Sequence, residues 1–219
     1  YADIPLINAG KRLGFEVTTT GNRPQELGHR YSDRYIPADF SDPQAILELA
    51  RKLNIDAICA CSNDFSALSS AYVAEAMGLK GHDAYETSQL LHHKDRYRQF
   101  AITHHIPSPY AKGFDQLATV QHEIQQFQLP IMVKPVDLTG GKGITKIETL
   151  DQASKALEYA FAISRVKKVV LEEFIEGSRH GFSAFIREGK VVFYFMDDEY
   201  YHLNPYMVAA TSTPATVNR

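Results

Sequence analysis

The amino-acid sequence predicts an α/β protein in which a doubly wound N-terminal domain with a parallel sheet precedes an α+β domain. Over the first hundred residues, short apolar strands alternate with helical patterns, as parallel α/β domains require. After Pro107 and Pro109 the pattern changes to strands separated by glycine-rich and hairpin turns. With 219 residues, 44% of them hydrophobic, the chain can bury the cores of one or two domains.

The composition excludes several classes of protein. The chain has 23 basic and 26 acidic residues and a net charge of -3, which argues against binding nucleic acid or an anionic membrane through bulk charge. No apolar run approaches the ~18–20 residues of a membrane helix, and no signal peptide is recognisable. We therefore expect a soluble, cytoplasmic protein. Because the chain begins at Tyr1 rather than Met, we also expect a segment of a longer protein.

The N-terminal elements follow from apolar periodicity and capping residues. The continuous apolar run at 56–61 is typical of a strand covered on both faces, and it would bury the thiols of Cys59 and Cys61 on one face. Ser62, Asn63 and Asp64 follow that strand, either as a helix N-cap or in contact with a substrate. The predicted elements are a helix over Pro5–Leu13, with Leu6, Ala9 and Leu13 on one face, a strand over Phe15–Thr20, a helix over Pro43–Leu53 capped by Asp42, a strand over Asp56–Cys61, and a helix over Phe65–Met77 closed by Gly78.

The second half begins with two helices that have no strand between them. Prolines at 107 and 109 then impose extended backbone. The predicted elements are helices over Tyr85–His92 and Lys94–His104, a strand over Tyr110–Phe114, a helix over Asp115–Phe127 capped by Asp115, strands over Pro130–Pro135 and Ile144–Ile147, a helix from Asp151, its cap, to Ile163, a strand over Lys168–Ile175, and a hairpin of Gly181–Arg187 with Lys190–Met196 around Glu188 and Gly189.

A glycine-rich loop joins two of these strands. It consists of Thr139, Gly140, Gly141, Lys142 and Gly143. It is not a P-loop, because Lys142 is followed by glycine rather than by serine or threonine, and it does not open a helix as a dinucleotide fingerprint would. The loop is either an ordinary hairpin turn between antiparallel strands or a turn that brings backbone N–H groups to an anion.

Two of the predicted strands carry charged residues that need explanation. Lys134 lies in an otherwise apolar strand, where an unpaired ammonium is costly, so it requires an anionic partner: either a phosphate or a buried carboxylate. The strand from Val169 becomes polar at its end, over Glu172–Gly177. It either ends in solvated glutamates or presents its backbone to the edge of an adenine.

The order of Lys94, Val133-Lys134-Pro135, the glycine loop and Glu172–Gly177 resembles the ATP-grasp superfamily. Its members include biotin carboxylase, the large subunit of carbamoyl-phosphate synthase and D-alanine–D-alanine ligase. The resemblance implies four regions: a pre-ATP-grasp α/β domain without its first strand (1–92), a helical linker (93–107), the ATP-grasp lid subdomain (108–195) and an incomplete start of the C-terminal ATP-grasp subdomain (196–219).

The resemblance also implies roles for individual residues. Lys94 would reach the α-phosphate, Lys134 would bridge the α- and β-phosphates, and residues 139–143 would fold over the β- and γ-phosphates. Glu172 would lie near the adenine amino group. The backbone of Glu173 and Ile175 would bind the adenine edge, with Phe174 between them. His180 is the candidate for the ribose, as in biotin carboxylase, with Glu176 as the alternative.

The cofactors implied by the resemblance are ATP and Mg²⁺. Asp197-Asp198-Glu199 lies too early in the chain for the magnesium site, so we expect its ligands beyond Arg219. The implied function is that of an ATP-dependent ligase, in which a carboxylate activated as an acylphosphate is attacked by an amine. Small-molecule acids and amines would be its substrates, and a homodimer is a possible assembly. Tyrosines 194, 200, 201 and 206 either line a substrate cleft or simply pack.

Two alternative functions remain at this point. One is a nucleotide-binding or regulatory module without catalysis. The other, a nicotinamide-dependent dehydrogenase, is disfavoured because the N-terminal domain contains no G-x-G-x-x-G between Tyr1 and Asp64.

Overall fold

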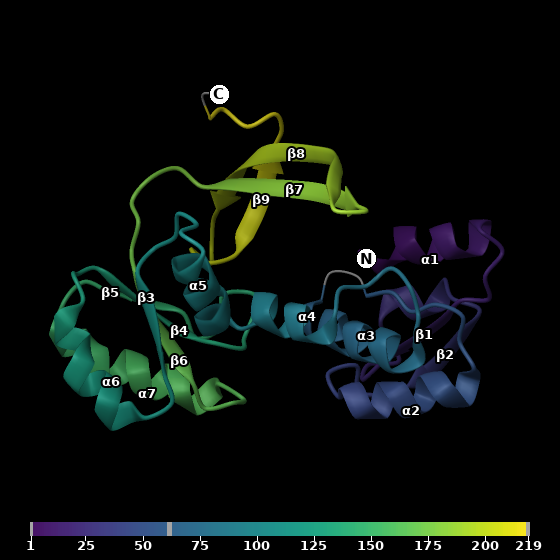
Figure 1. Cartoon of the computed structure of the whole chain (residues 1–219), viewed down its shortest axis with the longest axis horizontal. Coiled ribbons are helices and arrows are strands. Elements are labelled where there is room, and N and C mark those ends of the chain that lie inside the picture. The colour runs from purple at the N-terminus through teal and green to yellow at the C-terminus, as the bar shows by residue number, and fades with distance from the viewer. Residues whose placement is uncertain (1, 61–62, 218–219) are drawn as a thin grey trace. The chain divides into compact units, whose positions relative to one another are not determined.

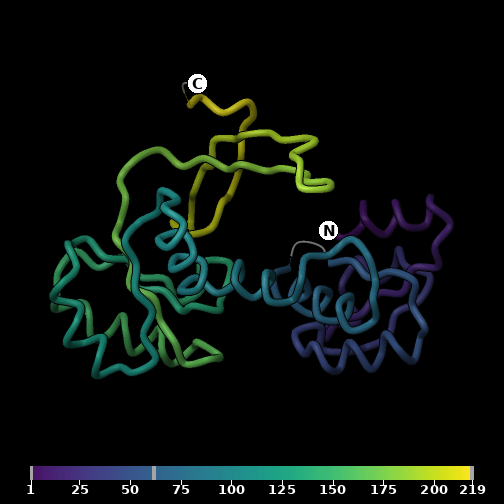
Figure 2. Tube along the Cα trace, in the orientation of Figure 1, coloured from purple at the N-terminus to yellow at the C-terminus, as the bar shows by residue number. Residues whose placement is uncertain are grey.

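The computed structural model describes residues 2–60 and 63–217 of the chain (Figure 1). It divides into two compact units, Tyr1–His93 and Lys94–Arg219. The backbone trace in Figure 2 follows the chain through the first unit and then through the second. Each unit is described by itself.

The first unit is built from helices around a small parallel sheet. Strands β1 and β2 pair in parallel, with Thr18 opposite Arg34. Ile46, Leu47 and Ala50 of one helix pack with Val73 of another to form its core. The elements are α1 (Asp3–Arg12), β1 (Thr18–Gly21), a 3-10 turn (Leu27–Arg30), β2 (Arg34–Pro37), α2 (Pro43–Leu53), α3 (Asp64–Met77) and α4 (Tyr85–His92).

The helix boundaries in this unit follow the predicted capping chemistry. The Asp42 side chain accepts hydrogen bonds from the backbone N–H groups of Gln44 and Ala45 at 3.0 and 3.1 Å. Asn63 accepts equivalent bonds from residues 65 and 66, so it is an N-cap, as one of the two interpretations held. Gly78 ends α3 in the left-handed conformation, with φ of 69°.

Two predictions for this unit are wrong. Residues 56–60 form no strand, because β1 and β2 pair only with each other among the described residues and this segment has no ladder partner. Cys59 is consequently exposed rather than buried, while Cys61 and Ser62 lie outside the described residues. In α1 the buried side chain is Ile7, whereas Leu13 is 76% exposed.

The second unit contains two antiparallel sheets. One has the strand order β3-β6-β4-β5 and the other the order β7-β8-β9. The elements are α5 (Lys94–Thr103), β3 (Ala111–Phe114), α6 (Leu117–Glu123), a 3-10 turn (Ile124–Gln126), β4 (Ile131–Pro135), β5 (Thr145–Ile147), a 3-10 turn (Leu150–Gln152), α7 (Ala153–Ile163), β6 (Val169–Glu173), β7 (His180–Arg187), β8 (Lys190–Tyr201) and β9 (Val208–Ser212).

Strand alternation decides which side chains of β4 and β6 are available to a site. Ile131 and Val133 of β4 face the core that α6 and α7 cover, together with Val169 and Leu171 of β6 (Figure 1). Since successive side chains point to opposite faces, Met132, Lys134, Val170 and Glu172 face away from that core. Lys134 pairs with Val170, and Met132 with Glu172, so Lys134 and Glu172 are diagonal neighbours on this face.

The predicted turns of this unit are largely confirmed, while two predicted caps are wrong. The hairpin turns at Glu188 and Gly189, with φ of 52° and 74°. Asp115 and Asp151 do not cap their helices, because α6 begins at Leu117 and α7, after a 3-10 turn, at Ala153. Strand β8 continues to Tyr201 and pairs with β9, which the sequence did not predict.

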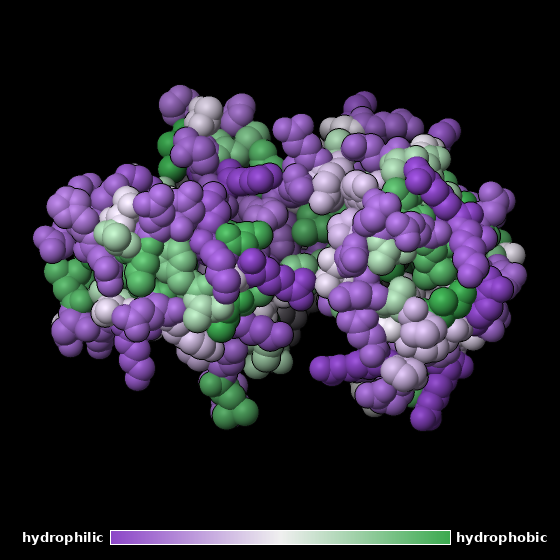
Figure 3. Space-filling view, turned by 90° about the horizontal axis from the view of Figure 1, so that it is seen from below, coloured by the Kyte–Doolittle hydropathy of each residue, from purple (hydrophilic) through white to green (hydrophobic). Residues whose placement is uncertain are grey.

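Exposed apolar side chains are concentrated on the β7-β8-β9 sheet of this unit. Phe182, Phe185 and Phe193 of strands β7 and β8 are all more than half exposed. On the face of the molecule seen in Figure 3, by contrast, hydrophobic residues form separate patches among hydrophilic ones. No helix within residues 2–60 and 63–217 is long and apolar enough to cross a membrane.

Candidate functional site

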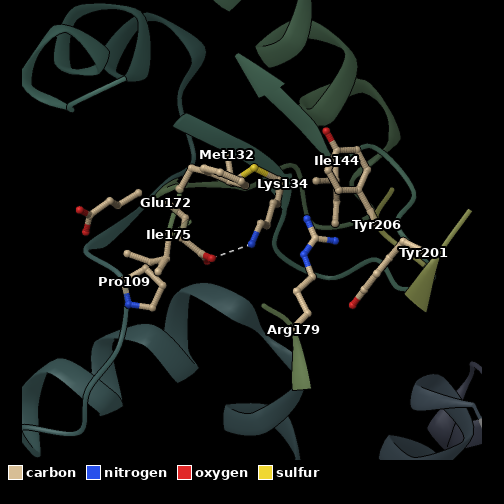
Figure 4. A pocket seen from close by; sticks show the side chains of 11 residues that line it. Pro109, Met132, Lys134, Ile144, Glu172, Ile175, Arg179, Tyr201 and Tyr206 are labelled. Carbon is tan, nitrogen blue, oxygen red and sulfur yellow. Dashed lines mark hydrogen bonds and ion pairs between the residues drawn. The ribbon is translucent and has the colours of Figure 1, made fainter. Parts of the chain in front are cut away.

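An open pocket lies on the face of β4 and β6 that is turned away from the helical core. Its volume is about 270 Å³, and it combines apolar side chains with charged ones (Figure 4). Its lining residues are Pro109, Met132, Lys134, Ile144, Glu172, Glu173, Phe174, Ile175, Arg179, Tyr201 and Tyr206.

Two charged side chains of the pocket wall, Lys134 and Glu172, belong to a cluster that Arg98 completes without lining the pocket itself. Lys134 Nζ lies 2.7 Å from Glu172 Oε1. The guanidinium of Arg98 grips the same carboxylate from α5, with Nε 3.0 Å from Oε2 and Nη2 3.1 Å from Oε1. Of the two partners considered for Lys134, the structure therefore contains the carboxylate. Two cations face one anion, so the cluster carries one positive charge beyond neutrality.

Glu172 is ionised despite its burial. Its side chain is only 6% exposed. Burial by itself would raise the pKa of Glu172, but the charge of Lys134 and the hydrogen bonds from Arg98 and Lys134 outweigh that effect, and the pKa lies below its ordinary value. The cluster is therefore a fixed arrangement of charges at neutral pH.

The glycine loop is the turn between antiparallel strands β4 and β5, as predicted. Gly140, Gly141 and Gly143 have φ of 65°, 72° and 73°, a region that favours glycine. A Cβ on Gly143 would lie 2.4 Å from Ile163 Cδ1, and one on Gly141 would lie 3.0 Å from the Asn204 side chain. The loop is consequently packed at two glycines, while Lys142 is exposed.

Lys94 contacts the backbone of Leu138, the residue just before the glycine loop. It opens α5, its backbone N–H donates to Val136 O at 3.1 Å, and its Nζ donates to Leu138 O at 2.5 Å. It is not among the side chains that line the pocket. The structure thus brings Lys94 to the segment that leads into the loop, and Lys134 to the pocket itself.

The segment after β6 forms another part of the pocket wall. Glu173, Phe174 and Ile175 all line it, as the adenine-edge interpretation requires. The backbone N–H groups of Glu173 and Phe174 donate to Tyr110 O and Pro130 O at 2.9 and 3.3 Å. The ammonium of Lys146 lies 4.0 Å from the centroid of the Phe174 ring, which fixes that ring from one side.

His180 has a different environment from the one expected of a ribose ligand. Its Nδ1 lies 2.7 Å from Asp198 Oδ1 and its Nε2 lies 2.6 Å from Ser178 Oγ. Hydrogen bonds from the Thr216 backbone and from His180 lower the pKa of Asp198. The Asp198 carboxylate is therefore an ionised partner for His180. Arg179 lines the pocket, whereas His180 is not among its lining residues.

Sequence reasoning missed two arginines of the site. Arg179 Nη1 donates to Pro205 O at 2.7 Å, and its Cζ lies 4.3 Å from the centroid of the Tyr201 ring. Arg98 lies 74 residues from Glu172 in sequence. The only signal for Arg179 was its place beside His180, and nothing local marked Arg98.

Two of the four tyrosines considered for a cleft, Tyr201 and Tyr206, line the pocket. The hydroxyl of Tyr201 donates to Glu199 Oε2 at 2.5 Å. Burial and the carboxylate of Glu199 both raise the pKa of Tyr201, which keeps its proton on the oxygen. The Tyr206 hydroxyl accepts from Lys146 N at 3.0 Å and so connects the 204–206 turn to β5.

The residues of this site do not fit a magnesium ion. Over residues 2–60 and 63–217, no group of three or more His, Cys, Asp or Glu side chains is placed to hold a metal ion. Glu172 is occupied by two cations, and the buried Asp137 accepts from Ser164 Oγ and from the backbone N–H groups of residues 165 and 166. Neither carboxylate is positioned as a metal ligand.

Sequence comparison links the chain to known proteins. Residues 92–204 match the profile of a family described as phosphoribosylglycinamide synthetase, ATP-grasp (A) domain. The formate-dependent phosphoribosylglycinamide formyltransferase of Burkholderia cenocepacia (strain HI2424) is 30% identical over 180 residues, covering 78% of this chain and 43% of that protein. The corresponding protein of Burkholderia lata is 31% identical with the same coverage. The chain thus spans less than half the length of these curated relatives.

Solved structures share the fold. Phosphoribosylglycinamide synthetase from Anaerococcus prevotii superposes with a TM-score of 0.70 at 18% identity, over 99% of this chain and 54% of that chain. N5-carboxyaminoimidazole synthetase from Staphylococcus aureus, complexed with ADP, gives a TM-score of 0.77 at 16% identity, over 99% and 56%. The predicted α/β fold class is confirmed.

Proposed function

The chain belongs to the family of the phosphoribosylglycinamide synthetase ATP-grasp (A) domain, and on that premise we propose that it is the ATP-binding part of an ATP-dependent ligase. ATP would occupy the pocket beside β4 and β6, with its phosphates toward Lys134 and the glycine loop. The adenine would lie along residues 173–175. Small-molecule acids and amines would be the substrates.

The observation that carries this proposal is the excess positive charge of the Lys134–Glu172–Arg98 cluster, of which Lys134 and Glu172 line the pocket. A buried anion needs a paired or hydrogen-bonded site, and a cluster with two cations and one carboxylate can accept a further anion without leaving a charge unmatched. Lys134 has a flexible stem and a single contact to Glu172, so its ammonium can turn toward a phosphate. The positive φ of the loop glycines supports a turn that exposes backbone N–H groups to the same anion.

The remaining lining suits a nucleoside. Met132, Ile144 and Ile175 are apolar, and Phe174 offers a ring face beside them. A flat, apolar base gains from such surfaces, while backbone groups of the 173–175 segment can read its polar edge. Arg179, which also lines the pocket, is a second cation near the same space.

The chemistry that follows from this arrangement is phosphoryl transfer by positioning and charge neutralisation. The γ-phosphoryl group of ATP would pass to a carboxylate oxygen with ADP as the leaving group, and an amine would then displace phosphate from the acylphosphate carbon. Relatives named formate-dependent phosphoribosylglycinamide formyltransferase support the substrate class, because formate is a carboxylate and glycinamide carries an amine. The residues of this chain would bind and orient ATP. Mg²⁺ has no fitting ligand set among the described residues, and none is assigned here.

Replacing Lys134 tests the proposal. In calorimetric titrations with ATP and Mg²⁺, Lys134→Ala should weaken binding by about 10- to 100-fold, since a charge-assisted hydrogen bond to phosphate contributes about 1.5–3 kcal/mol. The variant should fold, because Arg98 still neutralises Glu172.

Lys155→Ala is the matched control. Lys155 is exposed on α7 and does not line the pocket, so ATP affinity should not change. An unchanged affinity in Lys134→Ala, with wild-type circular dichroism, would remove the central assignment.

A further inference from the structure

Arg98 is the one member of the charged cluster to which the proposed function gives no task. Its guanidinium contacts both oxygens of Glu172, whereas Lys134 contacts one. Its third nitrogen, Nη1, donates to Ser108 Oγ at 3.2 Å. The contacts to Glu172 and Ser108 together fix the plane of the guanidinium group. Binding both oxygens of a carboxylate at once is a geometry that arginine provides and lysine does not.

The described part of the chain gives Glu172 no charged partner beyond these two cations. Among the described residues, the charged side chains in contact with Glu172 are Lys134 from β4 and Arg98 from α5. Its neighbours across the sheet, Ala111 on β3 and Met132 on β4, are uncharged. If Lys134 turned to a phosphate, Glu172 would therefore depend on Arg98 alone.

The helix that carries Arg98 is fixed to the sheet. The backbone N–H of Lys94 donates to Val136 O, and the Cα of Gly113 approaches so closely that a Cβ there would lie 2.7 Å from Asp95 Cβ. Arg98 is consequently presented to Glu172 from a backbone that is packed against β3 at one end. This makes Arg98 the permanent partner of the carboxylate and Lys134 the exchangeable one.

We propose that Arg98 is a positioning residue for nucleotide binding: it holds Glu172 in place and keeps it paired while Lys134 moves from that carboxylate to a phosphate. The inference rests on the proposed function, since it takes the incoming anion to be the phosphates of ATP. A buried carboxylate that lost both cations would be strongly disfavoured as an anion, so it would take up a proton instead.

The test is the proton uptake that accompanies ATP binding. Titrations of the whole protein with ATP and Mg²⁺ in two buffers of different ionisation enthalpy give the number of protons exchanged. Arg98→Gln should bind ATP about tenfold more weakly or worse, and it should take up more protons than the wild type near neutral pH. The double variant Arg98→Gln with Glu172→Gln should lose that extra uptake, because no titrating carboxylate remains.

Conservative and matched variants sharpen the comparison. Arg98→Lys keeps the charge without the two-point grip and should lie between Arg98→Gln and the wild type. Arg96→Gln replaces an exposed arginine of the same helix that is not one of the two cations paired with Glu172, and it should behave as the wild type. If Arg98→Gln does not fold, Arg98→Lys with and without Glu172→Gln carries the same comparison.

The outcomes separate this inference from the proposed function. A wild-type protein that binds no ATP overturns both. A wild type that binds ATP, together with an Arg98→Gln variant of equal affinity and equal proton uptake, overturns only the role of Arg98. Weaker binding with unchanged proton uptake also overturns it, because a purely structural loss would reduce affinity without adding a titrating group.

Discussion

Replacing Gly143 by alanine should destabilise the second unit more than any other substitution of one loop glycine. Gly143 has φ of 73°, and a Cβ there would lie 2.4 Å from Ile163 Cδ1 and 2.6 Å from Pro135 Cγ. The left-handed backbone costs a residue with a side chain about 1–2 kcal/mol. Overpacking adds about 1–3 kcal/mol, because the Pro135 ring cannot rotate away although the Ile163 side chain can. The expected loss is about 2–5 kcal/mol.

Gly140→Ala separates the two contributions. Gly140 has a similar φ of 65°, but no atom lies within 4 Å of a Cβ built there. Only the backbone term applies, so its loss should be about 1–2 kcal/mol. The difference between the two variants measures the close packing alone.

The assay must report on this unit rather than on the whole chain. Hydrogen exchange at increasing urea, read by mass spectrometry on peptides from β4 and β6, gives the opening free energy of that sheet. Adding Ile163→Val to Gly143→Ala removes one of the two colliding atoms, so the double variant should be more stable than the sum of the single losses predicts. Equal losses in Gly140→Ala and Gly143→Ala would refute the argument that packing requires glycine at 143.

Two further predictions concern charge and capping. Glu172→Gln should cost about 2 kcal/mol or more at neutral pH, because it leaves two partly buried cations without their anion. The folded-state pKa of Glu172 is lowered, so the stability that it contributes is fully present above the unfolded pKa and is lost as pH falls through the folded one. The urea midpoints of variant and wild type should therefore converge as the pH falls below the folded-state pKa. Asn63→Ala should destabilise α3 by about 1 kcal/mol, measured by exchange of α3 amides, and Asn63→Asp should retain stability; no loss in the alanine variant would contradict the cap.

Local chemistry explains which elements could be predicted. Asp42 and Asn63 cap their helices through bonds to residues two and three positions on, and Gly78 ends a helix through its own φ. Asp115 has the same residue type before a helical pattern, yet α6 begins at Leu117 after Gln116. The start of a helix also depends on where the preceding strand ends. The end of a strand is set by its pairing within the sheet rather than by the neighbouring residues in sequence.

The candidate site also has a part that local sequence predicts and a part that it does not. The glycine loop and the strand carrying Lys134 were predictable, because turn residues and strand alternation are properties of neighbours in sequence. Residues 56–60 were predicted wrongly, because an apolar run becomes a strand only if another strand pairs with it. Arg179, which lines the pocket, was not predicted, and the ribose role of His180 stays a prediction.

The sequence by itself determined most of the helices, the glycine turn and the need of Lys134 for an anion, since each follows from interactions within a few residues. Only the tertiary structure decided that this anion is Glu172 and that Arg98 holds it. Lys134 and Glu172 are 38 residues apart, and Arg98 and Glu172 are 74 apart. Contacts at such separations are selected by the packing of α5 and the register of β4 on β6, which no local pattern encodes.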